Sequence, residues 1–201
     1  NRDIYRTSLL DGSVVRLTDD PSKDEAPRYS PDGRYISFVS NRAGRKDLWL
    51  IDIDSGEKKK LVTEISNMLP LYDWSPDSQW IVTDIRNTGW GWRPRTAVVS
   101  VQTGLAFSVP APVSNGMDHA TWTSSWSPDG SKIAFQSNAG PGGNSEIWSM
   151  NVDGSDRVRL IMGSGMRQNE SPRWSPSGNE IAYNSHHGAG GTRDSYVTDL
   201  G

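Results

Sequence analysis

Residues 27–63 read PRYSPDGRYISFVSNRAGRKDLWLIDIDSGEKKKLVT, and this stretch decides the fold. It contains a Ser-Pro-Asp-Gly turn that begins at Ser30, a strand-like run from Asp47 onward, and a second turn at Gly56. Side chains that alternate with a period of two on both sides of a Pro-Asp-Gly turn are typical of a β-hairpin. The segment therefore predicts four antiparallel strands, joined in order by a tight turn, a variable loop and a glycine turn.

The same pattern recurs along the chain. The turn begins again at Ser75, Ser127 and Ser175, which gives spacings of 45, 52 and 48 residues, and an aromatic residue precedes every copy. The second copy has Ser78 in place of the turn glycine, and the fourth has Ser177 in place of the aspartate. Four antiparallel strands in a repeat of roughly 40 to 50 residues describe one blade of a β-propeller. We therefore expect an all-β fold, a propeller of four-stranded antiparallel blades with about four blades present.

The repeats place the whole chain, residues 1–201, in a single propeller domain or a propeller fragment. The copies lie near residues 27–63, 72–109, 124–161 and 172–200, and two further strands are expected within residues 3–18. This order leaves open strand edges at both ends, and the chain begins at Asn1 without Met or a leader. We expect a fragment of a larger ring of about five to eight blades, or closure and self-association through another chain. Four blades closing alone is the alternative.

Composition excludes several classes of protein. The 201 residues are 34% hydrophobic and 22% charged with a net charge of -3, as in an ordinary globular protein. No apolar stretch approaches the roughly 20 residues of a membrane-spanning helix, so no membrane insertion is expected. Basic residues are scattered, which argues against nucleic acid as a partner. The absence of Cys excludes a disulfide, a thiolate metal site and a cysteine nucleophile.

The turn, the Ser-Asn-Arg loop at Ser40 and the Asp-Leu-Trp-Leu-Ile-Asp strand at Asp47 together resemble a TolB-type, WD-like propeller repeat. The resemblance covers essentially the whole chain and implies the fold and a periplasmic or extracellular location. Such repeats occur in periplasmic TolB, in propeller domains of prolyl-oligopeptidase-like enzymes, in sensor proteins and in some polysaccharide lyases. The resemblance therefore leaves the function open.

One face of the predicted propeller carries irregular loops, and irregular loops on a rigid scaffold are where binding residues concentrate. The loop of the second repeat holds Trp90, Trp92, Arg93 and Arg95. Flat aromatic faces beside forked guanidinium donors suit acidic sugars or a protein hot spot. A tryptophan that folds back to cap its own blade is the structural alternative.

The three histidines, His119, His186 and His187, also fall in loops of this face, and Glu170 precedes the last repeat. Neutral imidazoles can act as general bases or bind a metal. However, adjacent histidines do not readily converge on one ion, and exposed loop histidines are the simpler interpretation. We assign no catalytic residue, no metal and no cofactor, because the sequence lacks a Gly-x-Ser-x-Gly elbow, a His-Glu-x-x-His helix and a phosphate-binding loop.

Three functions stay open on the sequence. The first is a non-catalytic recognition module that binds a protein or a glycan through the loop-rich face. The second is a carbohydrate-active lyase or hydrolase that uses the loop histidines, with Arg93 or Arg95 neutralising an acidic substrate. The third is the propeller domain of a prolyl-oligopeptidase-like peptidase. An enzyme would need at least two titratable groups within hydrogen-bond reach of each other, whereas a binding module needs only the aromatic and arginine surface.

Overall fold

The computed structural model of the chain describes residues 1–62, 71–86, 94–109, 113–114, 117–140, 143–163, 167–187 and 193–200. The regular elements of these residues are β-strands. Their bounds are β1 Tyr5–Thr7, β2 Val14–Arg16, β3 Asp24–Tyr29, β4 Tyr35–Ser40, β5 Asp47–Asp52, β6 Lys58–Val62, β7 Tyr72–Trp74, β8 Trp80–Arg86, β9 Pro94–Ser100, β10 Ala106–Ser108, β11 Val113–Ser114, β12 Met117–Asp118, β13 Thr121–Trp126, β14 Lys132–Ser137, β15 Glu146–Asn151, β16 Val158–Ile161, β17 Arg167–Trp174, β18 Glu180–His187 and β19 Arg193–Asp199. None of the described segments is a helix long and apolar enough to cross a bilayer.

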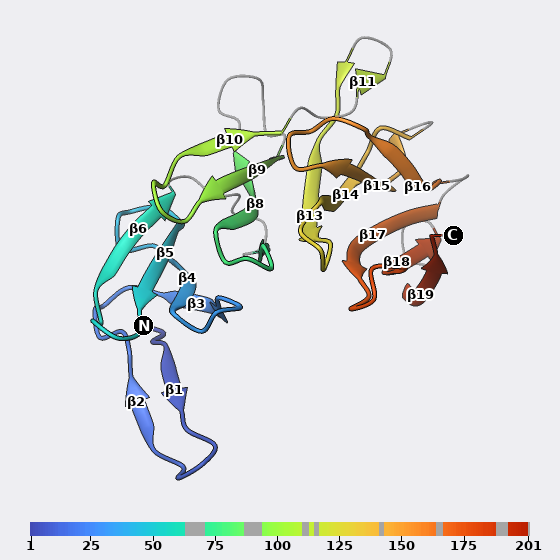
Figure 1. The fold of residues 1–201 in the computed structure, drawn as a ribbon. Coiled ribbons are helices and arrows are strands. Elements are labelled where there is room, and N and C mark those ends of the chain that lie inside the picture. Colours follow the sequence, from blue (N-terminus) through green and yellow to red (C-terminus); the bar gives the residue numbers. More distant parts are fainter. Residues whose placement is uncertain are drawn as a thin grey trace.

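The strands form consecutive antiparallel sheets that lie along an arc (Figure 1). We call β3–β6 blade 1, β7–β10 blade 2, β13–β16 blade 3, and the three-stranded sheet β17–β19 blade 4. The first strands β3, β13 and β17 lie toward the hollow side of the arc, and the β1–β2 hairpin projects from the end at blade 1 (Figure 1). The predicted all-β propeller architecture is confirmed. The small β11–β12 hairpin, which lies between blades 2 and 3, was not predicted.

The Ser-Pro-Asp-Gly turn is held by its own side chains. The Ser30 hydroxyl donates to Asp32 Oδ1 at 2.6 Å and accepts the Tyr35 amide at 2.9 Å, while Gly33 has a φ of +75°. Glycine adopts this left-handed conformation without a steric penalty. Ser78, which replaces the glycine in blade 2, keeps a φ of +61°, and its Oγ accepts the Asp32 amide at 3.0 Å. The serine that replaces glycine in the second repeat therefore links the turns of blades 1 and 2 through a hydrogen bond.

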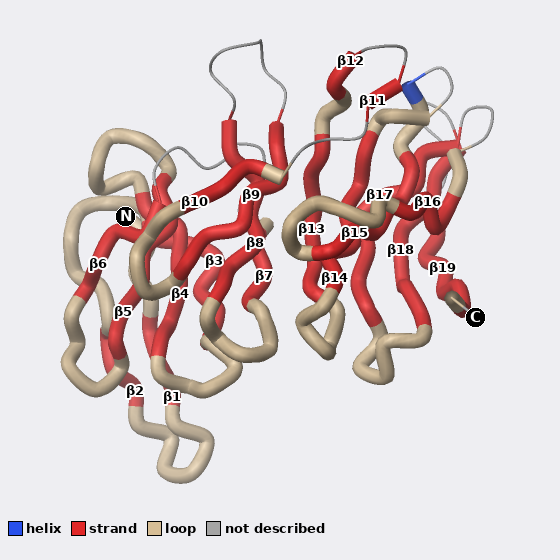
Figure 2. The backbone as a smooth tube through the Cα atoms, turned by 45° about the horizontal axis from the view of Figure 1, so that its top comes forward, coloured by secondary structure: helices blue, strands red, loops and turns tan. Residues whose placement is uncertain are grey.

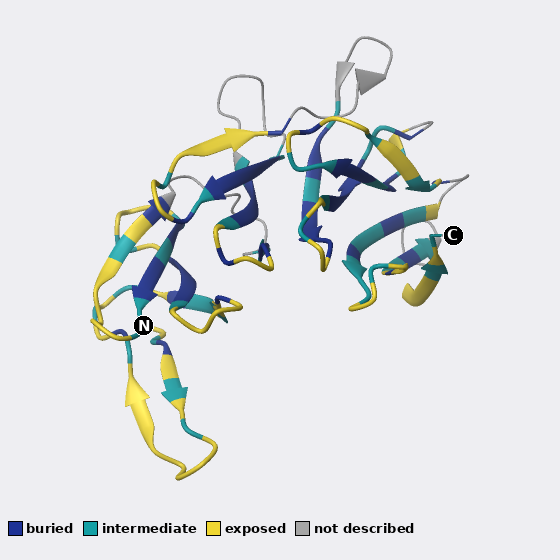
Figure 3. Ribbon diagram, in the orientation of Figure 1, coloured by how far each residue is buried: buried dark blue, intermediate teal, exposed yellow. Residues whose placement is uncertain are grey.

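Apolar side chains fill the seams between blades. Buried Val39, Leu48 and Leu50 of blade 1 pack against Tyr72 and Trp74 of blade 2, and comparable clusters join blade 2 to blade 3 and blade 3 to blade 4. Figure 3 shows buried residues concentrated in the blades and exposed residues along the β1–β2 hairpin. Each blade thus acts as the packing partner of the next, as expected for a repeat that cannot bury its faces alone.

The two ends of the strands differ in character. Figure 2 shows the β13–β14 and β17–β18 turns together at the lower edge of blades 3 and 4, and we call this end of the strands the turn face. The second strands β4, β8, β14 and β18 end, and the third strands β5, β9, β15 and β19 begin, at the opposite end, which we call the loop face. Glu170, His186 and Arg193 lie in the loop-face halves of β17, β18 and β19.

Candidate functional site

The structure describes only some of the residues that the sequence singles out. Trp90, Trp92 and Arg93 lie outside the described residues, and so does the side chain of His187. Arg95 is half-buried near the start of β9, where it pairs with Ile85 of β8. His119 is partly buried just before β13. The candidate site that can be built is therefore in blade 4.

Three charged or titratable side chains meet on blade 4, and we call them the blade 4 cluster. Glu170 Oε1 lies 3.2 Å from His186 Nε2, and Glu170 Oε2 lies 3.9 Å from Arg193 Nη2. Two of these residues, Glu170 and His186, were candidates from the sequence, and the structure brings them together. Arg193 was missed, because nothing in the sequence fixes the register of β19 against β18.

The strand register explains why these side chains share a face. His186 lies opposite Gln168 on β17 and opposite Arg193 on β19. Residues directly across an antiparallel pair point to the same face, and so do residues two apart on one strand, which places Glu170 beside Gln168. Gln168 in turn accepts the Ser145 amide at 2.8 Å, so the row is tied to blade 3.

The exposure of the cluster suits contact with a ligand. The side chains of Glu170 and His186 are 26% and 17% exposed, whereas that of Arg193 is 72% exposed. The guanidinium keeps donors for an incoming carboxylate or hydroxyl group, and the carboxylate supplies acceptors. Within the described ranges, His, Asp and Glu side chains form no group of three or more that could hold a metal ion.

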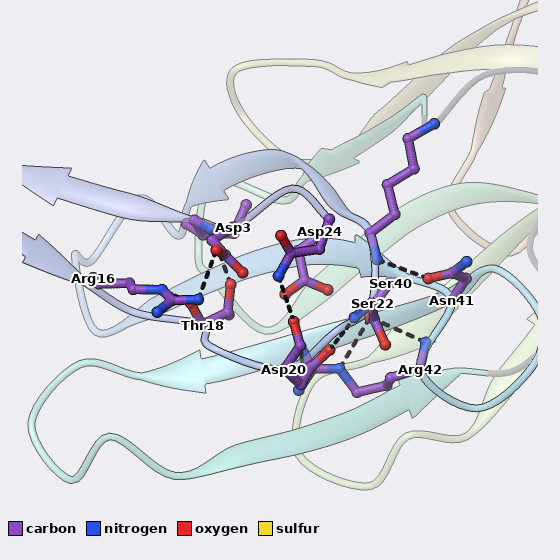
Figure 4. A network of polar contacts seen from close by, with 12 residues as sticks. Asp3, Arg16, Thr18, Asp20, Ser22, Asp24, Ser40, Asn41 and Arg42 are labelled. Carbon is purple, nitrogen blue, oxygen red and sulfur yellow. Dashed lines mark hydrogen bonds and ion pairs between the residues drawn. The ribbon is translucent and has the colours of Figure 1, made fainter.

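A second charged group, at the start of blade 1, is structural (Figure 4). Arg42 Nη2 lies 2.8 Å from Asp24 Oδ2 and 2.7 Å from Asp20 Oδ2, and Arg42 Nε donates to Ser40 Oγ at 2.9 Å. The guanidinium also lies over the Trp49 ring, 4.8 Å from its centroid. Because the Asp24 side chain is fully buried and Arg42 is shared among Asp24, Asp20 and Ser40, this group fixes the segment that enters blade 1.

Buried carboxylates join blade 2 to blade 3. Asp84 Oδ2 accepts the Thr123 amide at 2.9 Å, and Asp73 Oδ2 accepts the Trp126 amide at 2.9 Å. Burial raises the pKa of Asp84 to about 7 and raises that of Asp73, although hydrogen bonds and the charge of Arg173 oppose the rise. Sequence reasoning missed these residues. The available signal was a carboxylate within the apolar run of β8, and its partners are backbone amides, which indicates a structural role.

Comparisons with known proteins agree with this fold. No family model matches the sequence. The Tol-Pal system protein TolB of Syntrophus aciditrophicus is 39% identical over 57 residues, which are 28% of this chain and 13% of that protein. The chain spans a quarter or less of the length of the curated relatives that it matches.

Two solved structures resemble the chain over nearly its whole length. TolB from Acinetobacter baumannii superposes with a TM-score of 0.71 at 20% identity, covering 98% of this chain and 46% of that one. An oligogalacturonate lyase from Vibrio parahaemolyticus gives a TM-score of 0.72 at 20% identity, covering 99% of this chain and 56% of that one. In its repeat and in its fold, the chain is a TolB-like β-propeller.

Proposed function

We propose that the chain is a non-catalytic recognition module that binds a protein or a glycan through its loop face. The observation that carries the proposal is the blade 4 cluster, in which an exposed guanidinium lies beside a partly buried carboxylate–imidazole pair. The three side chains come from three adjacent strands of one sheet, so the backbone ladder holds their spacing before a ligand arrives. Such preorganisation reduces the entropy cost of binding.

The chemistry of the cluster favours a ligand that carries both acidic and hydroxyl groups. Arg193 is held by Glu170 only at 3.9 Å, a distance at which the guanidinium can turn to a ligand carboxylate at little cost. Glu170 then offers carboxylate acceptors to ligand hydroxyls. Acidic glycans and acidic protein surfaces both present this combination, and the TolB-like repeat is consistent with a periplasmic or extracellular partner of either kind.

A carbohydrate-active lyase or hydrolase is the second candidate, and one observation favours it. Glu170 Oε1 and His186 Nε2 lie 3.2 Å apart, which meets the requirement that two titratable groups lie within hydrogen-bond reach. A carboxylate that orients an imidazole is a common arrangement of a general base. The likeness to a solved oligogalacturonate lyase adds support from the fold alone. A peptidase propeller domain, the third alternative, has no specific support from the described side chains.

A glycan array that includes acidic oligosaccharides tests the proposal, with the purified chain applied in the presence and absence of EDTA. Arg193→Ala should abolish binding to the glycan that the parent chain binds on the array. Arg34→Ala is the matched control, because Arg34 is 61% exposed and pairs with an acidic residue, Asp52, but lies on the turn face. Release of a shortened glycan would establish the enzymatic alternative. Binding that Arg34→Ala abolishes and Arg193→Ala leaves intact would contradict the proposal.

A further inference from the structure

A cavity of about 670 Å³ lies between blades 3 and 4 and reaches the turn face. Its lining includes Lys132, Ser149 and Val158 of blade 3, and Trp174 and Pro176 of blade 4. The volume falls within the range of small-molecule sites, which is roughly 300 to 1,000 Å³. The blade 4 cluster lies at the other end of the strands, so the cavity is separate from the proposed recognition surface.

This seam lacks the aromatic side chain that the other two have at one position, and a much smaller cavity of about 140 Å³ lies beside Tyr35 and Leu50 of blade 1. Five residues after the first serine of the turn, blade 1 has Tyr35 and blade 2 has Trp80, and both pack against the core of the following seam. Trp80 also meets the Phe107 ring edge-on, with centroids 6.1 Å apart. Blade 3 has Lys132 at this position, and Lys132 lines the cavity.

The outer strands of blade 3 show the same loss of volume. In blade 2, Val98 lies directly opposite Phe107; Val98 belongs to the buried cluster between blades 2 and 3, and Phe107 packs edge-on against Trp80. The equivalent pair in blade 3 is Ser149 opposite Val158, and both residues line the cavity. Where blade 2 has Trp80, Val98 and Phe107, and blade 1 has Tyr35, Leu50 and Lys59, blade 3 has Lys132, Ser149 and Val158. Side chains that are polar or small thus line one space from three strands of blade 3.

The indole of Trp174, in the wall of the cavity, lacks the hydrogen-bond partner that its equivalent has in the first seam. In the seam of blades 1 and 2, Trp74 Nε1 donates to Ser37 Oγ at 2.8 Å. Ala134 is the equivalent of Ser37 in blade 3, and Trp174 Nε1 is buried without a partner among the described residues. Trp126 Nε1, at the equivalent position in the seam of blades 2 and 3, is likewise buried without a partner among the described residues, so this feature is not confined to the cavity.

Lys132 supplies the charge. Its ammonium lies 3.1 Å from Asp156 Oδ2 and 3.3 Å from Asn151 Oδ1, and the Asp156 side chain is 60% exposed. This partner is exposed to solvent and can yield to a ligand at little cost. A carboxylate that lines the cavity itself, that of Asp129, accepts the hydroxyls of Ser127 at 2.6 Å and Ser131 at 2.8 Å. The cavity therefore combines apolar walls with one ammonium, whose present partners Asp156 and Asn151 lie outside its lining.

We infer that this cavity binds a small amphipathic carboxylate, whose apolar body packs on Trp174 and Pro176 and whose carboxylate is held by Lys132. An ammonium is a point charge and needs no particular geometry from its partner, so a single carboxylate satisfies it. The indole ring gives the apolar body a flat surface of large area.

The test uses 4-phenylbutyrate and its primary amide, with dissociation constants measured by ligand-observed NMR. The parent chain should bind the acid at least about tenfold more tightly than the amide, as expected for a hydrogen bond to a charged group. Lys132→Met should lower the affinity for the acid to that for the amide, and should leave the affinity for the amide unchanged. Lys60→Met is the control, because Lys60 is similarly exposed and pairs with an acidic residue on blade 1.

Filling the cavity gives an independent result. Ser149→Leu introduces the side chain that Leu50 has at the equivalent position of blade 1. Val158→Phe introduces the side chain that Phe107 has at the equivalent position of blade 2, and Val158 is more exposed than Ser149. Either variant should abolish binding of both probes, and an unchanged melting temperature would confirm that it folds. The inference is overturned if the parent chain does not bind the acid at millimolar concentration, or if it binds the acid and the amide equally. It is also overturned if Lys132→Met binds the acid as the parent does, or if a folded cavity-filling variant still binds the probes.

Discussion

Replacing Asp84 by Asn should remove a pH dependence from the stability of the propeller. Burial of this carboxyl between blades 2 and 3 raises its pKa from the ordinary value of 3.8 to about 7. A pKa that is higher in the folded state than in the unfolded state favours folding fully below the unfolded pKa, and this advantage is lost as the pH rises to the folded pKa. At about 1.4 kcal/mol for each pH unit, the loss between pH 3.8 and pH 7 is about 4 kcal/mol.

Above pH 5, the effect of Asp84 on stability can be told apart from that of the carboxyls whose pKa is lowered. Hydrogen bonds from neighbouring serines lower the pKa of Asp11 and Asp129 to about 2, and the hydrogen bond and charge of Lys46 lower that of Glu25. Groups with a lowered pKa stabilise the fold above their unfolded pKa, and this contribution is lost only as the pH falls below about 4.5. Asp73, whose pKa burial raises, acts in the same direction as Asp84.

Urea unfolding between pH 5 and pH 8 measures the effect. The free energy of unfolding of the parent should fall by about 3 kcal/mol across this range, and most of the fall should be absent in Asp84→Asn, whose carbonyl can still accept the Thr123 amide. Asp54→Asn, at an exposed position, should follow the parent. An Asp84→Asn profile parallel to that of the parent would refute the assignment of a neutral carboxyl to this seam.

Two further predictions concern the blades themselves. Arg42→Ala should lower the free energy of unfolding by about 3 kcal/mol in a urea titration, because it strands the buried Asp24 carboxylate, whereas Arg34→Ala at an exposed pair should cost less than about 1 kcal/mol. Equal losses would contradict the structural role of Arg42. Ser78→Ala should lower the melting temperature more than Ser78→Gly, since both lose the bond to the Asp32 amide but only glycine relieves the positive φ; the opposite order would refute this reasoning.

Much of the fold is readable from the sequence, because the signal is local and repeated. The turn at Ser30 carries its own hydrogen-bond pattern, and its recurrence predicts every blade without knowledge of long-range contacts. The β11–β12 hairpin was missed because it departs from the repeat, and its strands are only two residues long each.

The candidate site was only partly predictable. Glu170 and His186 could be placed on the loop face, but their contact at 3.2 Å depends on the register of β17 and β18, which is shifted by an irregularity between Glu170 and Arg173. Likewise, the cavity beside Lys132 is visible only when equivalent residues of three blades are compared in space. A local sequence pattern does not specify which variable positions pair with each other over a long range.

The central claim is that the loop face of blade 4 recognises an external ligand, and one measurement tests it most directly. It is the ratio of the dissociation constants of Arg193→Ala and Arg34→Ala for the glycan or protein that the parent chain binds. We predict that Arg193→Ala binds at least about tenfold more weakly, because it loses a charge-assisted contact, while Arg34→Ala binds as the parent does. Equal affinities of the two variants would contradict the claim.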